Sequence, residues 1–145
     1  MRCFIKAMRE YANFDGRSGR REYWLFIIGW AFFGALSIWI DGAAGTYNFR
    51  TGVAVVESFW FFGFLLPWMA ATARRLHDTG RSGWFMSPFL LALVYFYIFA
   101  MPAARPYLMP YLAPAAFLAL AWAVFMALPG NEGENDYGRP EQAWC

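Results

Sequence analysis

Charged and metal-binding side chains are scarce in this sequence of 145 residues. Only 15% of the residues are charged, against about 25% in ordinary soluble domains, while 60% are hydrophobic. This composition argues against a soluble enzyme and excludes a disordered chain. One histidine and two cysteines, Cys3 and Cys145, are too few for a metal site or a disulfide framework. The net charge of +2 gives no indication of nucleic acid binding.

Four long stretches are almost free of charge, with Glu57 as the single exception: residues 23–40, 53–73, 84–101 and about 111–128. About 20 helical residues cross a hydrocarbon core of about 30 Å, so each stretch is long enough to span a membrane. The stretches are continuously apolar, whereas the strands of a membrane barrel alternate between apolar and polar residues. Four such stretches leave too little polar surface for a soluble bundle. We therefore predict an all-α, polytopic membrane protein with four transmembrane helices.

The lysines and arginines fall mostly on one side of this arrangement. Ten of the twelve lie in the N-terminal segment, in the loop between the second and third stretches, or in the C-terminal tail. Because positive loops stay in the cytoplasm, we expect both termini and the middle loop to be cytoplasmic. The chain then consists of a cytoplasmic segment 1–22, a membrane domain 23–128 and a cytoplasmic tail 129–145.

Two of the links between the stretches are rich in turn-forming residues. Residues 41–52 contain three glycines and are expected to form a loop. Prolines recur at every fourth position from 102 to 114, and each would remove a backbone hydrogen bond from a helix. We interpret 102–110 as a loop at the membrane surface. An early, kinked start of the fourth helix is the alternative.

The densest polar patch, ARRLHDTGRSG, lies between the second and third stretches. In it His77 precedes Asp78, and three arginines surround the pair. Because imidazole changes charge near neutral pH, one hypothesis makes His77 a proton shuttle or pH sensor. The alternative, which we favour, is a structural network in which Asp78 neutralises arginines and caps the third helix. We expect Asp78 to accept hydrogen bonds from at least one arginine, because such charge-assisted bonds are strong.

Two further patterns concern the cytoplasmic segments. The acids of the tail lack the spacing of a calcium loop, so we expect a solvated tail that lies against the basic loop. The sequence Gly-Arg-Ser-Gly occurs at 16–19 and again at 80–83, each time before an apolar stretch. This repeat is either chance or the mark of two related helical hairpins, with Arg17 and Arg81 at equivalent depths.

Three segments, NFDGRSGRREYW, RRLHDTGRSGW and GNEGENDYGRP, together resemble one family pattern. From about Tyr11 to Pro140 the chain is similar to the bacterial inner-membrane family known as domain of unknown function 805. The resemblance implies four membrane helices and an inner-membrane location, and it brings no established activity, substrate or cofactor. The family-like positions are Gly16, Arg17, Arg21, Glu22, Arg74, Arg75, Leu76, His77, Asp78, Gly80, Arg81, Gly83, Trp84, Asn135, Tyr137 and Gly138. All of these except Leu76, Asn135, Tyr137 and Gly138 form the candidate functional motif.

Three functional hypotheses follow for a protein of this kind. The first is a structural or partner-binding membrane module with a basic cytoplasmic face. The second is a small oligomeric channel or carrier, and the third is a lipid-head-group enzyme that uses His77 and Asp78. We assign no catalytic residue, metal or cofactor. The expected partners are membrane lipids and either a protein or a second copy of the chain, and no nucleic acid.

Overall fold

The computed structural model describes residues 2–48, 54–95 and 108–140. Within these ranges the chain is helical and contains no strand, which confirms the all-α prediction for the residues described. The helices are α1 (Arg2–Arg9), α2 (Arg20–Ala44), α3 (Val55–Asp78), the 3-10 helix η1 (Gly83–Met86), α4 (Ser87–Tyr95) and α6 (Leu108–Ala127).

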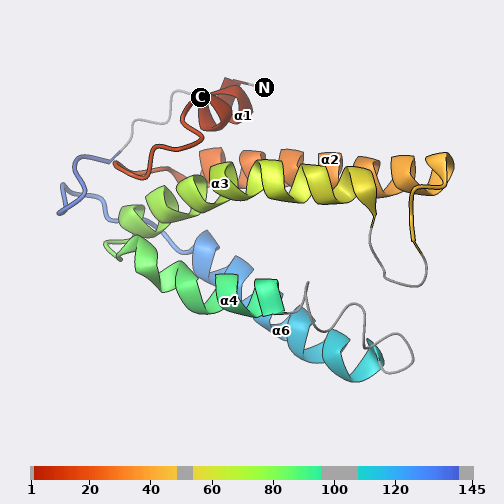
Figure 1. The fold of residues 1–145 in the computed structure, drawn as a ribbon. Coiled ribbons are helices and arrows are strands. Elements are labelled where there is room, and N and C mark those ends of the chain that lie inside the picture. The colour runs from red at the N-terminus through yellow and green to blue at the C-terminus, as the bar shows by residue number, and fades with distance from the viewer. Residues whose placement is uncertain (1, 49–53, 96–107, 141–145) are drawn as a thin grey trace.

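The helices form two pairs, with α1 folded onto the first of them (Figure 1). Helices α2 and α3 lie side by side and antiparallel. Helices α4 and α6 form the second pair, in which Phe89 stacks on Trp122. The two pairs converge where α3 ends and η1 begins, and they separate toward the opposite end. The segment after α6 returns to the end of α3, so the point of convergence also receives the C-terminal tail.

Helices α2 and α3 are each long and apolar enough to cross a membrane, and a shorter apolar helix covers Ala116–Ala127. Only 22% and 28% of the most apolar windows of α2 and α3 are buried within the protein. Large side chains such as Phe32 and Phe59 are exposed. A core helix of a soluble protein would bury these side chains, whereas a lipid-facing helix leaves them outward.

The first apolar helix is longer than the sequence predicted, because residues 41–44 continue α2 instead of forming a loop. Asp41 is fully buried, and its carboxylate accepts hydrogen bonds from the backbone amides of Val56 (3.0 Å) and Glu57 (2.7 Å). The end of α2 therefore caps the start of α3. Gly45 then ends α2 in the left-handed conformation, at a φ of 68° that favours glycine.

The second pair also departs from the expected boundaries. The predicted third stretch begins as η1 and continues as α4, and its part beyond Tyr95 lies outside the described residues. Helix α6 begins at Leu108, so the interpretation of 108–110 as a loop is wrong and the early helix start is correct there. Pro110 occupies the first turn, where backbone amides lack helical acceptors, so it removes no helical bond. The prolines at 102 and 106 lie outside the described residues.

Helix α1 lies against α2, an arrangement that the sequence did not predict. The Phe4 ring stacks on Phe26 with a centroid distance of 5.9 Å and an interplanar angle of 21°. It also covers Gly29 so closely that an added Cβ would lie 2.7 Å from the ring. The expected cytoplasmic segment 1–22 thus reaches at least two turns down the first apolar helix.

One of the hydrophobic clusters lies where the two pairs converge. Buried side chains from α2, α3, η1 and α6 meet there, namely Tyr23, Ala73, Leu76, Met86 and Met126. This core holds the end of α3 in place, and the end of α3 carries four of the twelve residues of the candidate functional motif: Arg74, Arg75, His77 and Asp78.

Candidate functional site

The carboxylate of Asp78 is held by two buried arginines from different parts of the chain. Arg17 donates from Nε (3.0 Å) and Nη2 (2.9 Å) to the Oδ1 atom. Arg75, one turn earlier on α3, donates from Nη1 to Oδ2. The prediction that Asp78 accepts hydrogen bonds from an arginine is confirmed. Because both oxygens are engaged in ion pairs, this carboxylate is poorly placed to act as a general base.

Arg17 also connects α3 to the C-terminal tail. Its Nη1 atom donates to the carbonyl oxygens of Gly133 (2.7 Å) and Gly138 (3.1 Å), and its Nη2 atom donates to that of Asn131. The tail thus contacts the basic region, as expected, but through backbone carbonyls. Its acidic side chains at 132, 134 and 136 are exposed, while Glu141 lies outside the described residues.

Arg75 completes the end of α6. Its Nε atom donates to the carbonyl of Met126 at 3.0 Å, and its Nη2 atom donates to that of Leu128. A cation at these carbonyls satisfies acceptors that the helix leaves free and complements the helix dipole. Burial lowers the pKa of the Arg75 guanidinium, which lies beyond the apolar stretch ending at Ala73. The Asp78 carboxylate opposes this shift, and the nearby charge of Arg20 adds to it.

Two tight turns bring these groups together. Gly16 and Gly80 both have positive φ values, 84° and 72°, which place the chain in the left-handed region that favours glycine.

The start of the tail approaches Asp78 closely. The backbone of Asn131 donates to the carbonyl of Asp78 at 2.8 Å. Gly130 lies so close to Asp78 that an added Cβ would fall 2.0 Å from Oδ2. Glycine at 130 is therefore required for the tail to approach the ion pair.

His77 lies beside this network and is covered by the tail. Its ring stacks on Tyr137 at 3.8 Å with an interplanar angle of 3°, and its Nδ1 atom lies 3.2 Å from the Gly16 carbonyl oxygen. The Asn135 side chain donates to the His77 carbonyl at 2.9 Å. Burial lowers the pKa of His77, although the Gly16 carbonyl and the charge of Asp15 oppose this shift. A neutral ring with its proton on Nδ1 fits this contact.

Arg74 and Glu22 belong to a second cluster, under α1. Arg74 is buried and donates from Nη1 to the carbonyls of Glu10 (3.0 Å) and Asn13. Glu22 is also buried and pairs with Lys6 at 3.3 Å. These contacts attach the N-terminal segment to the start of α2 and the end of α3, on a side different from the Asp78 network.

The remaining residues of the candidate motif are not part of the ion-pair network. Arg81 lies over the Phe125 ring at 4.5 Å, Trp84 is exposed on η1, and Arg21 is exposed on α2. Gly83 packs against Ala73, because an added Cβ would lie 3.2 Å from the alanine side chain.

The Gly-Arg-Ser-Gly repeat has one shared feature and two differences. The first glycine of each copy has a positive φ, so both copies begin with a similar turn. Ser82 accepts from the Trp84 amide at 3.4 Å, whereas the Ser18 hydroxyl is buried without a partner in the described part of the chain. Arg17 and Arg81 also contact different groups, an ion pair and an aromatic ring, which gives the hairpin hypothesis no support.

Several groups of the site were missed by sequence reasoning. The carbonyls of residues 126, 128, 131, 133 and 138 supply most of the acceptors, and backbone acceptors have no side-chain signature. Asn135 and Tyr137 were noted only as family-like positions. The signal that could have found them was their place in the tail segment GNEGENDYGRP. Across the described ranges, no cluster of three or more His, Cys, Asp or Glu residues could hold a metal ion.

Comparisons with known proteins agree with this pattern of residues. A family model described as "Protein of unknown function (DUF805)" matches residues 11–139. Inner membrane protein YhaI of Escherichia coli (strain K12) is 33% identical over 139 residues, covering 95% of this chain and 93% of the relative. Inner membrane protein YhaH of the same strain is 33% identical over 94 residues, covering 65% and 77%. Uncharacterized protein YiiR of that strain is 30% identical over 135 residues, covering 90% and 86%. No solved structure matches.

Proposed function

The chain belongs to the DUF805 family of proteins of unknown function, and we propose that it is a structural or partner-binding module of the bacterial inner membrane. In this proposal four helices, near residues 23–40, 53–73, 84–101 and 111–128, cross the membrane. Both termini and the middle loop lie in the cytoplasm. The names of two relatives, which describe inner membrane proteins, and the exposed apolar faces of α2 and α3 support this location.

The orientation rests on the distribution of positive charge. Arg17, Arg74, Arg75 and Arg81 gather at the end of the bundle where α3 ends and the tail returns. Positive residues close to membrane helices favour the cytoplasmic side. This end of the molecule would therefore be the cytoplasmic one.

The observation that carries the proposed role is that both carboxylate oxygens of Asp78 accept hydrogen bonds from arginines. Its two oxygens, together with Arg17 and Arg75, join the 16–18 turn, α3, the end of α6 and the tail. Arg17 and Arg75 each pair with Asp78 and also donate to backbone carbonyls of a later segment of the chain. Such a junction favours a rigid cytoplasmic surface formed by the 16–18 turn, the end of α3, the end of α6 and the tail, which we call the platform. A rigid surface suits the binding of a partner. An enzyme would need His77 or Asp78 free to meet a substrate.

Reporter fusions test the membrane topology. Fusions after Tyr47 and Tyr107 should report a periplasmic location, and fusions after Ser82 and at the C-terminus should report the cytoplasm. A periplasmic C-terminus would require an odd number of spans and would contradict the four-helix arrangement.

Site-specific photocrosslinking in cells tests the partner-binding role. A photoreactive residue at Trp84 or Tyr11, both exposed near the platform, should give a discrete protein adduct. The matched control is Phe59, which is exposed on the apolar part of α3. Only lipid adducts at all three positions would contradict a protein partner. Solute flux through liposomes that contain the purified protein would instead favour the channel or carrier hypothesis.

A further inference from the structure

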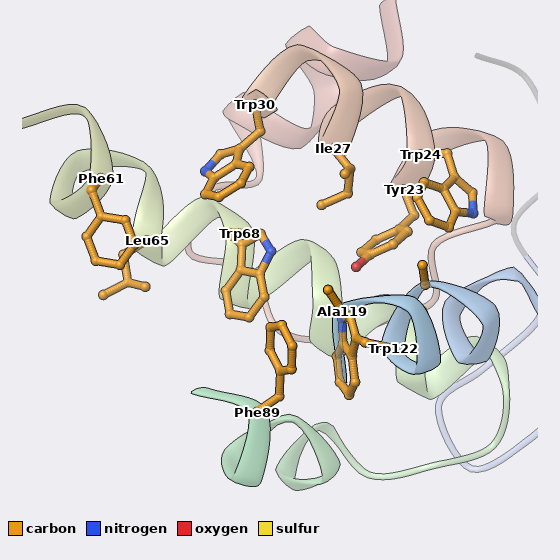
Figure 2. A pocket seen from close by; sticks show the side chains of 11 residues that line it. Tyr23, Trp24, Ile27, Trp30, Phe61, Leu65, Trp68, Phe89, Ala119 and Trp122 are labelled. Carbon is orange, nitrogen blue, oxygen red and sulfur yellow. The ribbon is translucent and has the colours of Figure 1, made fainter. Parts of the chain in front are cut away.

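An apolar cavity of about 260 Å³ lies between the two helix pairs. Its wall is mainly aromatic and includes Trp24, Trp30, Phe61, Trp68, Phe89 and Trp122 (Figure 2). The lining residues come from the first half of α2, the middle of α3 (Phe61, Leu65 and Trp68), the start of α4 and the second half of α6. The cavity therefore extends from the Asp78 end of the bundle, where Tyr23 and Trp122 line it, to the middle of α3. The Asp78 end is the cytoplasmic one in the proposed orientation.

A series of aromatic contacts connects the cavity wall to Arg81. Phe89 lies 6.0 Å from Trp68 and stacks on Trp122 at 4.8 Å, with an interplanar angle of 8°. Trp122 contacts Phe125 at 5.9 Å, and the Arg81 guanidinium lies over the Phe125 ring. Arg81 is thus placed at the cytoplasmic end of the cavity, on the side formed by α6.

A second arginine lies on the side formed by α2. Arg20 precedes the lining residues Tyr23 and Trp24 by one helical turn, so it shares their face of α2. It is exposed, and it lies close enough to Arg75 for the two charges to interact. Within the part of the chain that the structure describes, the guanidinium groups of Arg20 and Arg81 have no hydrogen-bond acceptor, although that of Arg81 lies over the Phe125 ring. Two unpaired guanidinium groups therefore accompany one apolar cavity.

We propose that this cavity binds an acyl chain of an anionic phospholipid whose phosphate pairs with Arg20 and Arg81. The arginine fork suits a phosphate oxygen pair, and the cytoplasmic leaflet supplies a lipid with its head group at the level of the arginines. Ligand pockets commonly measure about 300–1,000 Å³, so this cavity, at about 260 Å³, suits part of one chain rather than a whole lipid. The inference rests on the membrane embedding and orientation proposed above.

Titration of phosphatidylglycerol into delipidated full-length protein, followed by native mass spectrometry, tests this site. Phosphatidylglycerol should bind more tightly than phosphatidylethanolamine. Each of Arg20→Gln and Arg81→Gln should weaken phosphatidylglycerol binding about fivefold. Arg21→Gln is the matched control, because Arg21 is exposed in the same turn of α2 but points about 100° away around the helix.

A cavity-filling variant, Ala123→Phe, tests the acyl-chain half of the site while leaving both arginines intact. It should abolish lipid binding while its melting temperature in lipid-free detergent stays within a few degrees of the wild type. Equal loss from Arg20→Gln and Arg21→Gln, or equal binding of the two lipids, would overturn the proposal. The proposal would also be overturned if the lipid-free wild type formed dimers and Ala123→Phe did not. A second copy of the chain would then occupy the cavity. The reporter fusions test the orientation separately, so either idea can fail alone.

Discussion

Arg17 and Asp78 lie 61 positions apart in the sequence and form a buried, two-pronged ion pair at 2.9 and 3.0 Å. Arg75 takes the second carboxylate oxygen, and both arginines extend to backbone carbonyls of other segments. A buried ion pair adds little stability relative to well-packed apolar groups, but removal of one partner leaves an uncompensated charge. The network therefore specifies which segments meet, and the fold depends on each of its members.

Removal of the Asp78 charge should destabilise the protein strongly. Asp78→Asn leaves two buried guanidinium groups without their counter-ion, so we expect a loss of about 3–5 kcal/mol in the free energy of unfolding. Thermal unfolding in detergent measures this loss. The control is Glu134→Gln, which removes an exposed pair with Arg139 at 3.4 Å and should cost at most about 1 kcal/mol. Equal effects of the two variants would contradict a structural network.

Replacement of Arg17 by lysine tests whether the fork geometry matters as well as the charge. Lysine keeps the charge, but its single ammonium cannot reach the carboxylate and three tail carbonyls together. We expect Arg17→Lys to destabilise the protein by about 1–3 kcal/mol, because buried acceptors lose their donors. The tail should also become more sensitive to protease. Arg139→Lys, at an exposed position of the same tail, should change neither quantity.

The sequence was sufficient for the helical class, for an arginine partner of Asp78 and for a tail that lies against the basic region. Each of these depends on local composition. The choice of Arg17 among the arginines was not visible, because it depends on how α2 and α3 pair. The carbonyl acceptors of the tail could not be predicted either, since every residue carries one.

Asp41 shows a second limit of sequence reasoning. A charged residue followed by glycine, directly after an apolar run, is typical of a loop. In the fold this carboxylate is buried and caps α3, which allows α2 to continue to Ala44. The hydrophobic pattern identifies where the apolar run ends. It does not identify where the helix ends when another element satisfies the polar groups.

The close approach of Gly130 to the ion pair gives a steric test. An added Cβ would lie 2.0 Å from Oδ2 of Asp78, and two arginines prevent that carboxylate from moving freely. Gly130→Ala should therefore destabilise the protein by about 1–3 kcal/mol, as overpacking of a close contact does. Gly133→Ala is the matched control, because no heavy atom lies within 4 Å of its added Cβ. A similar fall in melting temperature for both variants would show that loss of glycine flexibility, rather than the contact, is responsible.

The half-buried position of His77 predicts a pH dependence of stability. Because burial lowers the pKa of His77 in the folded protein, the unfolded chain binds a proton more readily than the folded one. The free energy of unfolding should therefore have its full value above the unfolded pKa of about 6.5. It should decrease as the pH falls below that value, because the unfolded chain then takes up the proton first. We expect the melting temperature to fall between pH 7.5 and pH 5.5, and the fall to be smaller in His77→Gln, which cannot take up that proton.

The control is Tyr137→Leu, which removes the stacked ring but keeps the histidine. It should lower the melting temperature at both pH values and retain a pH dependence. An identical fall in His77→Gln and the wild type would assign the titration to other groups.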